Sequence, residues 1–163
     1  MSHRLLTFLD SLRSPLASMA GLPVESVAVY AQQDMAMHIA GVIARHRCAV
    51  MMGFSGLEIG GKADIPVPGP PVDATLEITV WTPEVVLQAG GPLAMDVAEC
   101  IIAGLHGRRP PEGAPGMALV PRFRSASIIS RTGGQGTARH LVATLIFKVP
   151  VCLRPSRPLA SSS

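Results

Sequence analysis

A row of apolar residues at every second position runs through the segment 137–151, TARHLVATLIFKVPV. Every second side chain at positions 141–149 is apolar, whereas Thr144 and Lys148 fall between them. A period of two places the apolar side chains on one face of an extended strand, so this segment predicts a β-strand with one buried face. A chain that contains such a strand must supply partner strands and a covering layer.

A second run of strand-forming residues comes directly before it, ALVPRFRSASIISR at 118–131, and the glycine-rich sequence TGGQG joins the two. Two such runs with a short glycine-rich connection predict an antiparallel hairpin. The glycines could instead suggest a phosphate cradle, but a cradle requires the loop to open a helix, whereas this loop leads into a strand. We therefore interpret TGGQG as the tip of a hairpin.

Two longer segments show the helical period. Residues 3–20 and 92–107 repeat apolar side chains every three or four positions, and Gly21 and Gly107 follow their ends. Pro15 inside the first segment predicts a kink, or a break into two short helices with Ser14 as a new cap.

Shorter elements lie between these helices. We expect a short strand at 27–30, a short helix that begins at Asp34, and strands at 48–54 and 74–82. The buried side of the short helix would carry Ile39, Val42 and Ile43, and the strand at 48–54 would be bent or ended by Gly53 and Gly56.

The helices are too few to link most of these strands by parallel crossovers. We therefore predict an α+β fold with an antiparallel or mixed sheet of about four strands and two main helices packed on one face. The length of 163 residues suits one domain, which we place at 1–153, and the tail at 154–163 is predicted to be disordered. Residues 60–73, rich in proline and glycine, predict a long loop of the kind that often carries function.

The composition favours a partner. Charged residues make up only 15% of the chain, which is low for an independent monomer, so homo-oligomerisation is expected. The net charge of +3 comes from 12 arginines and 2 lysines, and arginine is well suited to interfaces. Because the arginines are scattered and no aromatic-rich strand accompanies them, sequence-specific nucleic-acid binding is not expected.

No catalytic motif is present. One helix face could carry Asp34, His38 and His46. Helical spacing alone does not make a zinc site, so we favour structural roles for these residues. No GxSxG elbow or cofactor motif occurs. We assign no catalytic, cofactor-binding or metal-binding residues and expect no enzymatic activity and no cofactor.

The cysteines and the N-terminal residues indicate the cellular compartment in which the protein is expected. The three cysteines are widely spaced, which favours buried reduced thiols and synthesis in the cytoplasm. Residues 1–21 resemble a signal peptide only superficially, because Asp10 and Arg13 interrupt the apolar run. No segment is apolar over the length needed to span a bilayer, so no membrane association is expected.

Three apolar side chains lie on the face of the predicted sheet that the two main helices do not cover. Trp81, Val142 and Ile146 lie on the strand faces opposite those that would meet the two main helices. Either another subunit or a second layer of the same chain must cover these side chains, and the sequence leaves both possibilities open.

The order of elements resembles the tail terminator and tail-completion proteins of tailed phages, of the Mu-like or lambda-like kind. The resemblance covers residues 3–151 and lies in the opening helix, the strand at 48–54, the loop at 60–73, the strand ATLEITVWTP, the helix PLAMDVAECIIAGLHG and the closing hairpin. It implies a structural protein of the virion tail, assembled in the host cytoplasm. Its copies would form a ring, commonly a hexamer, that caps the tail tube and meets the head connector.

The resemblance also implies roles by position. Trp81, Val142 and Ile146 would lie at subunit contacts, and the hairpin tip with Gly133 and Gly134 would make axial contacts, together with the loop at 60–73. Four arginines could line a lumen, attract passing DNA without reading its sequence, or pair with acidic neighbours: Arg122, Arg124, Arg131 and Arg139.

Two other classes of protein remain open. One is a head–tail joining protein or another minor tail protein, which would share the sparsely charged surface but use a different partner. The other is a small cytoplasmic enzyme or ligand-binding α+β domain, which would present a pocket with convergent polar groups.

Overall fold

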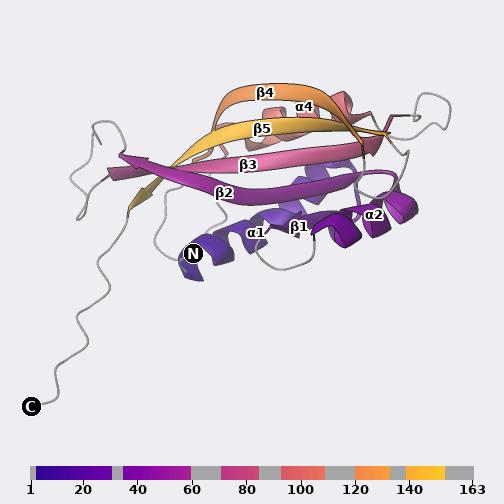
Figure 1. Ribbon diagram of the computed structural model, residues 1–163. Coiled ribbons are helices and arrows are strands. Elements are labelled where there is room, and N and C mark those ends of the chain that lie inside the picture. The colour runs from indigo at the N-terminus through magenta and orange to yellow at the C-terminus, as the bar shows by residue number, and fades with distance from the viewer. Residues whose placement is uncertain are drawn as a thin grey trace, which may run out of the picture.

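A single mixed sheet organises the chain in the computed structural model, which describes residues 3–30, 35–59, 71–84, 93–108, 120–132 and 139–152 (Figure 1). In chain order the elements are α1 (His3–Ala20), η1 (Val24–Ser26), β1 (Val27–Val29), α2 (Met35–His46), β2 (Ala49–Ile59), β3 (Pro71–Pro83), α4 (Ala94–Leu105), β4 (Arg122–Thr132) and β5 (Arg139–Cys152). The predicted α+β class is confirmed, and β1 adds a fifth strand to the four that were most evident.

The strands follow the order β1-β2-β3-β5-β4 across the sheet. β1 pairs with β2 in parallel, and every other neighbouring pair is antiparallel. The parallel pair is linked through α2, because parallel neighbours need a crossover connection rather than a tight turn. The predicted hairpin is present as the antiparallel pair β4–β5.

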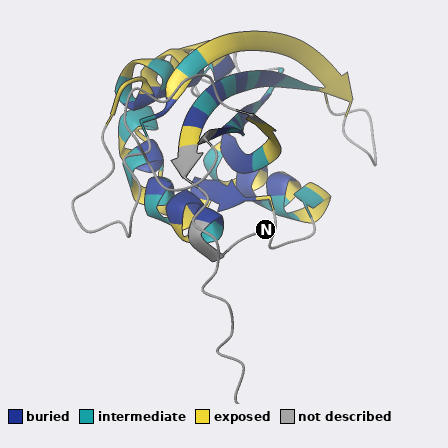
Figure 2. Cartoon of the chain, turned by 90° about the vertical axis from the view of Figure 1, so that its left-hand side faces the viewer, coloured by how far each residue is buried: buried dark blue, intermediate teal, exposed yellow. Residues whose placement is uncertain are grey.

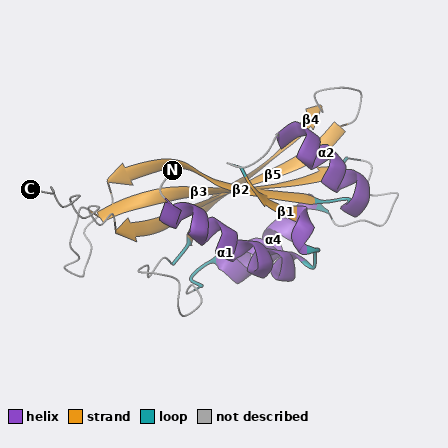
Figure 3. Cartoon of the chain, turned by 90° about the horizontal axis from the view of Figure 1, so that it is seen from below, coloured by secondary structure: helices purple, strands orange, loops and turns teal. Residues whose placement is uncertain are grey.

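The main core lies between the sheet and the helices α1 and α4, which cover the same face (Figure 3). The alternation in β5 accounts for its share of this core, since Ala143, Leu145, Phe147 and Val149 are fully buried there. The apolar stripes of the two helices face these residues, with Leu9 and Leu16 from α1 and Ile101 and Leu105 from α4.

Helix α2 lies on the opposite face of the sheet (Figure 3). Its buried residues Ile39, Val42 and Ile43, which the sequence pattern predicted, form a smaller core with Ala49 and Met51 of β2. A second layer of the same chain therefore covers part of this face, at the β1–β2 side. The rest of the face, over β5 and β4, is not covered by any helix that the structure describes.

In two elements the structure excludes one of the alternatives that the sequence left open. α1 runs unbroken through Pro15, so it does not divide into two helices. β2 does not end at its glycines but continues to Ile59, with a shift in register between Phe54 and Gly56. A bulge of this kind bends a strand without ending it, so of the two predicted alternatives the bend agrees with the structure and the end does not.

Only one of the expected buried thiols is established. Cys48 is fully buried directly before β2, and burial raises the pKa of its thiol to about 12, so the thiol stays protonated at neutral pH. Cys100 is exposed on α4, contrary to the expectation that it would be buried. The side chain of Cys152 lies outside the described residues.

Candidate subunit interface

The candidate surface begins beside α2. Trp81 of β3 is half-buried against the α2 cluster, and its indole N–H donates a 3.0 Å hydrogen bond to the hydroxyl of Thr79. The ring of Trp81 also meets His140 edge-on, with centroids 6.4 Å apart. The indole is therefore held in one orientation, and it forms the boundary between the covered and the uncovered parts of this face.

Tyr30 extends the polar contacts at this boundary. Its hydroxyl lies 2.9 Å from that of Thr79, so Thr79 joins two aromatic side chains from different elements. Tyr30 is exposed overall, but partial desolvation of its hydroxyl raises its pKa, with a smaller contribution of the same sign from Glu77. The hydrogen bond to Thr79 and the charge of Arg131 act in the opposite direction.

The other two apolar candidates differ in exposure. Val142 pairs directly with Trp81 and with Ile129 and is only 2% exposed, so its side chain is covered by its own chain rather than offered to a partner. Ile146 pairs with Glu77 and is half-buried, so part of its side chain reaches the surface. All three candidates share the face opposite α1 and α4, as the alternation predicted.

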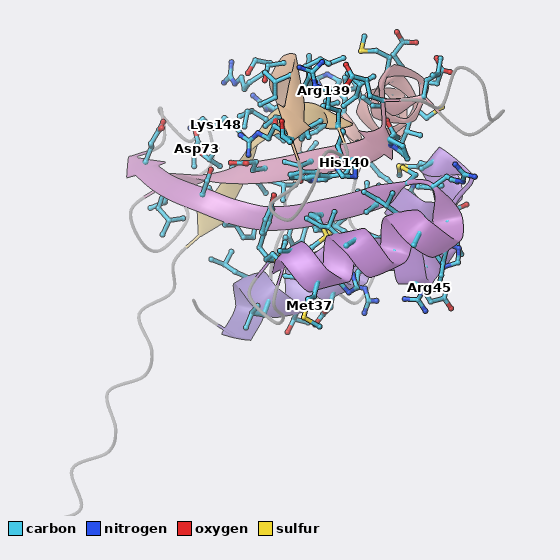
Figure 4. All side chains as sticks on the ribbon, turned by 45° about the vertical axis from the view of Figure 1, so that its right-hand side comes forward. Met37, Arg45, Asp73, Arg139, His140 and Lys148 are labelled. Carbon is cyan, nitrogen blue, oxygen red and sulfur yellow. The ribbon has the colours of Figure 1, made fainter. Side chains whose placement is uncertain are left out.

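A polar cluster occupies the far end of the same face. The ammonium of Lys148 on β5 lies 2.8 Å from a carboxylate oxygen of Glu58 on β2 and donates a 2.8 Å hydrogen bond to the hydroxyl of Thr75. Figure 4 shows Lys148 near Asp73 at this end of the sheet, whereas Arg139 and His140 lie at the other end. Two acidic side chains of this face, Glu58 and Asp73, thus lie together at the end of β2 and the start of β3.

The four candidate arginines separate into two groups. Arg122, Arg124 and Arg131 are exposed on β4, and none of them forms an ion pair with a carboxylate in the described ranges. Arg139, at the start of β5, lies 3.9 Å from a carboxylate oxygen of Glu84. Both side chains of this pair are well exposed, so the interaction is weak.

Gly133 and Gly134 fall outside the described residues, as do positions 60–70 of the predicted loop and the tail at 154–163. Their proposed contacts stay predictions.

Strand β4 is the feature that sequence reasoning missed. It pairs only with β5 in the described part of the chain, and nearly all of its side chains are exposed on both faces (Figure 2). The exposed side chains include two adjacent isoleucines, Ile128 at 40% and Ile129 at 41%. The signal was available in the letters SASIIS, because neighbouring isoleucines point to opposite faces and cannot both enter one core.

Metal binding and membrane spanning find no support in the described residues. They contain no group of three His, Cys, Asp or Glu side chains placed to hold a metal ion. Among them, no helix combines the length and apolar character needed to cross a bilayer.

Comparison with known proteins leaves the family open. No family profile and no curated protein matches the chain. Among solved structures 18 chains match. One, whose name describes no function, covers 96% of this chain and 99% of its own at 17% identity and a TM-score of 0.47. A similarity at this level carries no argument about fold or function, so any functional conclusion depends on the chain's own geometry.

Proposed function

We propose that this chain is a structural protein of the tail of a phage or phage-like particle. Its copies form a ring that caps the tail tube and joins it to the head connector, after assembly in the host cytoplasm. The proposal combines the order of elements along the chain with the sparsely charged composition and with one structural observation, the exposed strand β4.

The exposure of β4 is the observation that supports the proposal most strongly. An 11-residue edge strand presents a row of unpaired N–H and C=O groups, and proteins that remain monomeric usually protect such an edge with charges, proline or a bulge. In β4 the arginines and the irregular register lie toward the ends, whereas residues 125–130 read SASIIS with no charge or proline. A strand of this kind favours association with another chain.

A ring follows when the contact joins two different surfaces of each copy. Head-to-tail contacts generate closed rings if the rotation between neighbours closes, and open filaments if it does not. The exposed arginines of β4 would then face either a neighbouring subunit or the central channel. In the channel they would attract DNA through its phosphates, with no preference for sequence.

Electron microscopy of the purified protein mixed with tail tubes tests the proposal. We expect density at tube ends only, because a cap recognises the terminal ring of the tube and not its wall. Binding along the tube wall, or no binding, would contradict the proposal. Binding to isolated head connectors without binding to tubes would instead favour the head–tail joining alternative.

A further inference from the structure

The sheet has a second open edge, at the end of β2. β1 pairs only with positions 50–52 of β2, and the N–H of Tyr30 donates the last hydrogen bond of this pair to the carbonyl of Met52. Beyond that point no described strand lies alongside β2, and positions 55–58 are exposed. Leu57 is a large apolar side chain on this edge and is 52% exposed.

The two open edges have compatible directions. From β2 through β3 and β5 to β4 each neighbour is antiparallel, so β4 runs antiparallel to β2. Two copies placed edge to edge in the same orientation would therefore bring β4 of one copy antiparallel to β2 of the next. We propose that neighbouring copies join in this way, with β4 adding to residues 53–59 of β2 and continuing the sheet from subunit to subunit.

Steric hindrance by β1 and the exposed apolar side chains indicate the same position for β4 along β2 of the neighbouring copy. β1 blocks the first half of the β2 edge, so an added strand must lie along positions 53–59 and run toward β1. The uncharged middle of β4 can then pair with β2 of the neighbouring copy, while the N-terminal end of β4 extends past the end of that β2. Leu57 and Ile128 lie on the face of the sheet that α1 and α4 cover, because their strand partners Ala74 and Ala143 belong to that core. This arrangement brings the exposed Ile128 toward Leu57, so that an apolar side chain from each edge leaves water.

Charge favours the same arrangement. β4 exposes three arginines and no acid, whereas the end of β2 carries Glu58 with Asp73 of β3 beside it. Lys148 offsets one of these two carboxylates, which leaves one net negative charge in the cluster. In the antiparallel direction, the arginines at 122–124 approach this acidic end.

The main competing arrangement is two-fold pairing of β4 with itself. An antiparallel pair centred on Ser127 would bring Arg131 of each copy beside the segment of the other copy that carries Arg122 and Arg124. Like charges at neighbouring cross-strand positions destabilise pairing, so the head-to-tail arrangement is favoured.

The inference rests on the proposed ring, and paired edge variants test it separately. Ile128→Asp blocks β4 and Leu57→Asp blocks the β2 edge, while Met37→Asp adds the same charge at a 75% exposed position on α2 (Figure 4). Native mass spectrometry over a concentration series reads out assembly, and circular dichroism checks folding. If an aspartate variant loses its native spectrum, Ile128→Lys or Leu57→Lys replaces it.

We expect each edge variant alone to raise the concentration for half-assembly by about tenfold or more, since each buries an unpaired charge at the contact. A mixture of the two should form one-to-one heterodimers and nothing larger, because only one of the two edge contacts stays intact. Met37→Asp should assemble like the wild type.

Three results would overturn the inference: normal assembly of Leu57→Asp, loss of assembly in Met37→Asp, or a wild-type chain that stays monomeric at every concentration. None of these excludes end-on capping of tail tubes, so the proposed function can survive a failure of this contact.

Discussion

At the residue scale, Gly53 shows how closely the small core on the α2 side is built. A Cβ added at this position would lie 2.9 Å from Cδ2 and 3.1 Å from Cβ of Tyr30. The absence of a side chain on β2 therefore lets Tyr30 lie against the strand and reach the hydroxyl of Thr79.

We predict that Gly53→Ala destabilises the fold by about 1–3 kcal/mol, because the new methyl group forces Tyr30 away from the strand. Gly56→Ala is the matched control on the same strand, since its added Cβ would meet nothing within 4 Å. The control should be neutral or stabilising, within about 1 kcal/mol. Urea unfolding of both variants measures the difference, and equal effects would contradict this role for Gly53.

At the element scale, the approach of α1 to α4 depends on a second glycine. A Cβ on Gly104 would lie 2.6 Å from the sulfur and 2.7 Å from Cγ of Met19. Gly41, in α2, would meet nothing within 4 Å. The two glycines therefore lie in helices of equal length but in different surroundings.

We expect Gly41→Ala to stabilise the protein by about 0.5–1 kcal/mol, because alanine is the better helix former. Gly104→Ala should lose this gain and destabilise the protein by roughly 1 kcal/mol, since Met19 must leave its place between the helices. Thermal unfolding of the two variants gives the comparison. Stabilisation by Gly104→Ala would show that α1 and α4 can adjust at no cost.

Sequence periodicity predicted most elements, because their faces differ sharply in polarity. The alternation of β5 predicted a strand and its buried face, and the apolar stripe of α4 predicted a helix and its buried face. The full extent of β2 could not be predicted, since glycine in a strand pattern can indicate either an end or a bulge. The face covered by α2 was also beyond the sequence, because Ile39, Val42 and Ile43 show that the helix is amphipathic but not which side of the sheet it meets.

The candidate surface was predicted less completely than the fold. The period of two predicted that three side chains lie on the sheet face opposite α1 and α4, those of Trp81, Val142 and Ile146. The coverage of Val142 by its own chain did not, because it depends on the pairing of β5 with both β3 and β4. The open edges required the strand order, which brings β4 to one end of the sheet and leaves half of β2 free at the other.

At the scale of the whole molecule, the sheet of the described residues has two unpaired edges. Two helices cover one face, a third covers part of the other, and no described strand pairs with β4 on its outer side or with the second half of β2. A copy with two different, directionally compatible edges can join a neighbour at each side. Rotation between neighbours then decides whether the assembly closes.

Native mass spectrometry of the unmodified chain across a concentration series tests this central claim most directly. The account predicts monomer at low concentration and one discrete larger species at high concentration, because closure of a ring adds one contact that no open intermediate possesses. A chain that remains monomeric throughout, or that forms an open-ended series of growing oligomers, would contradict it.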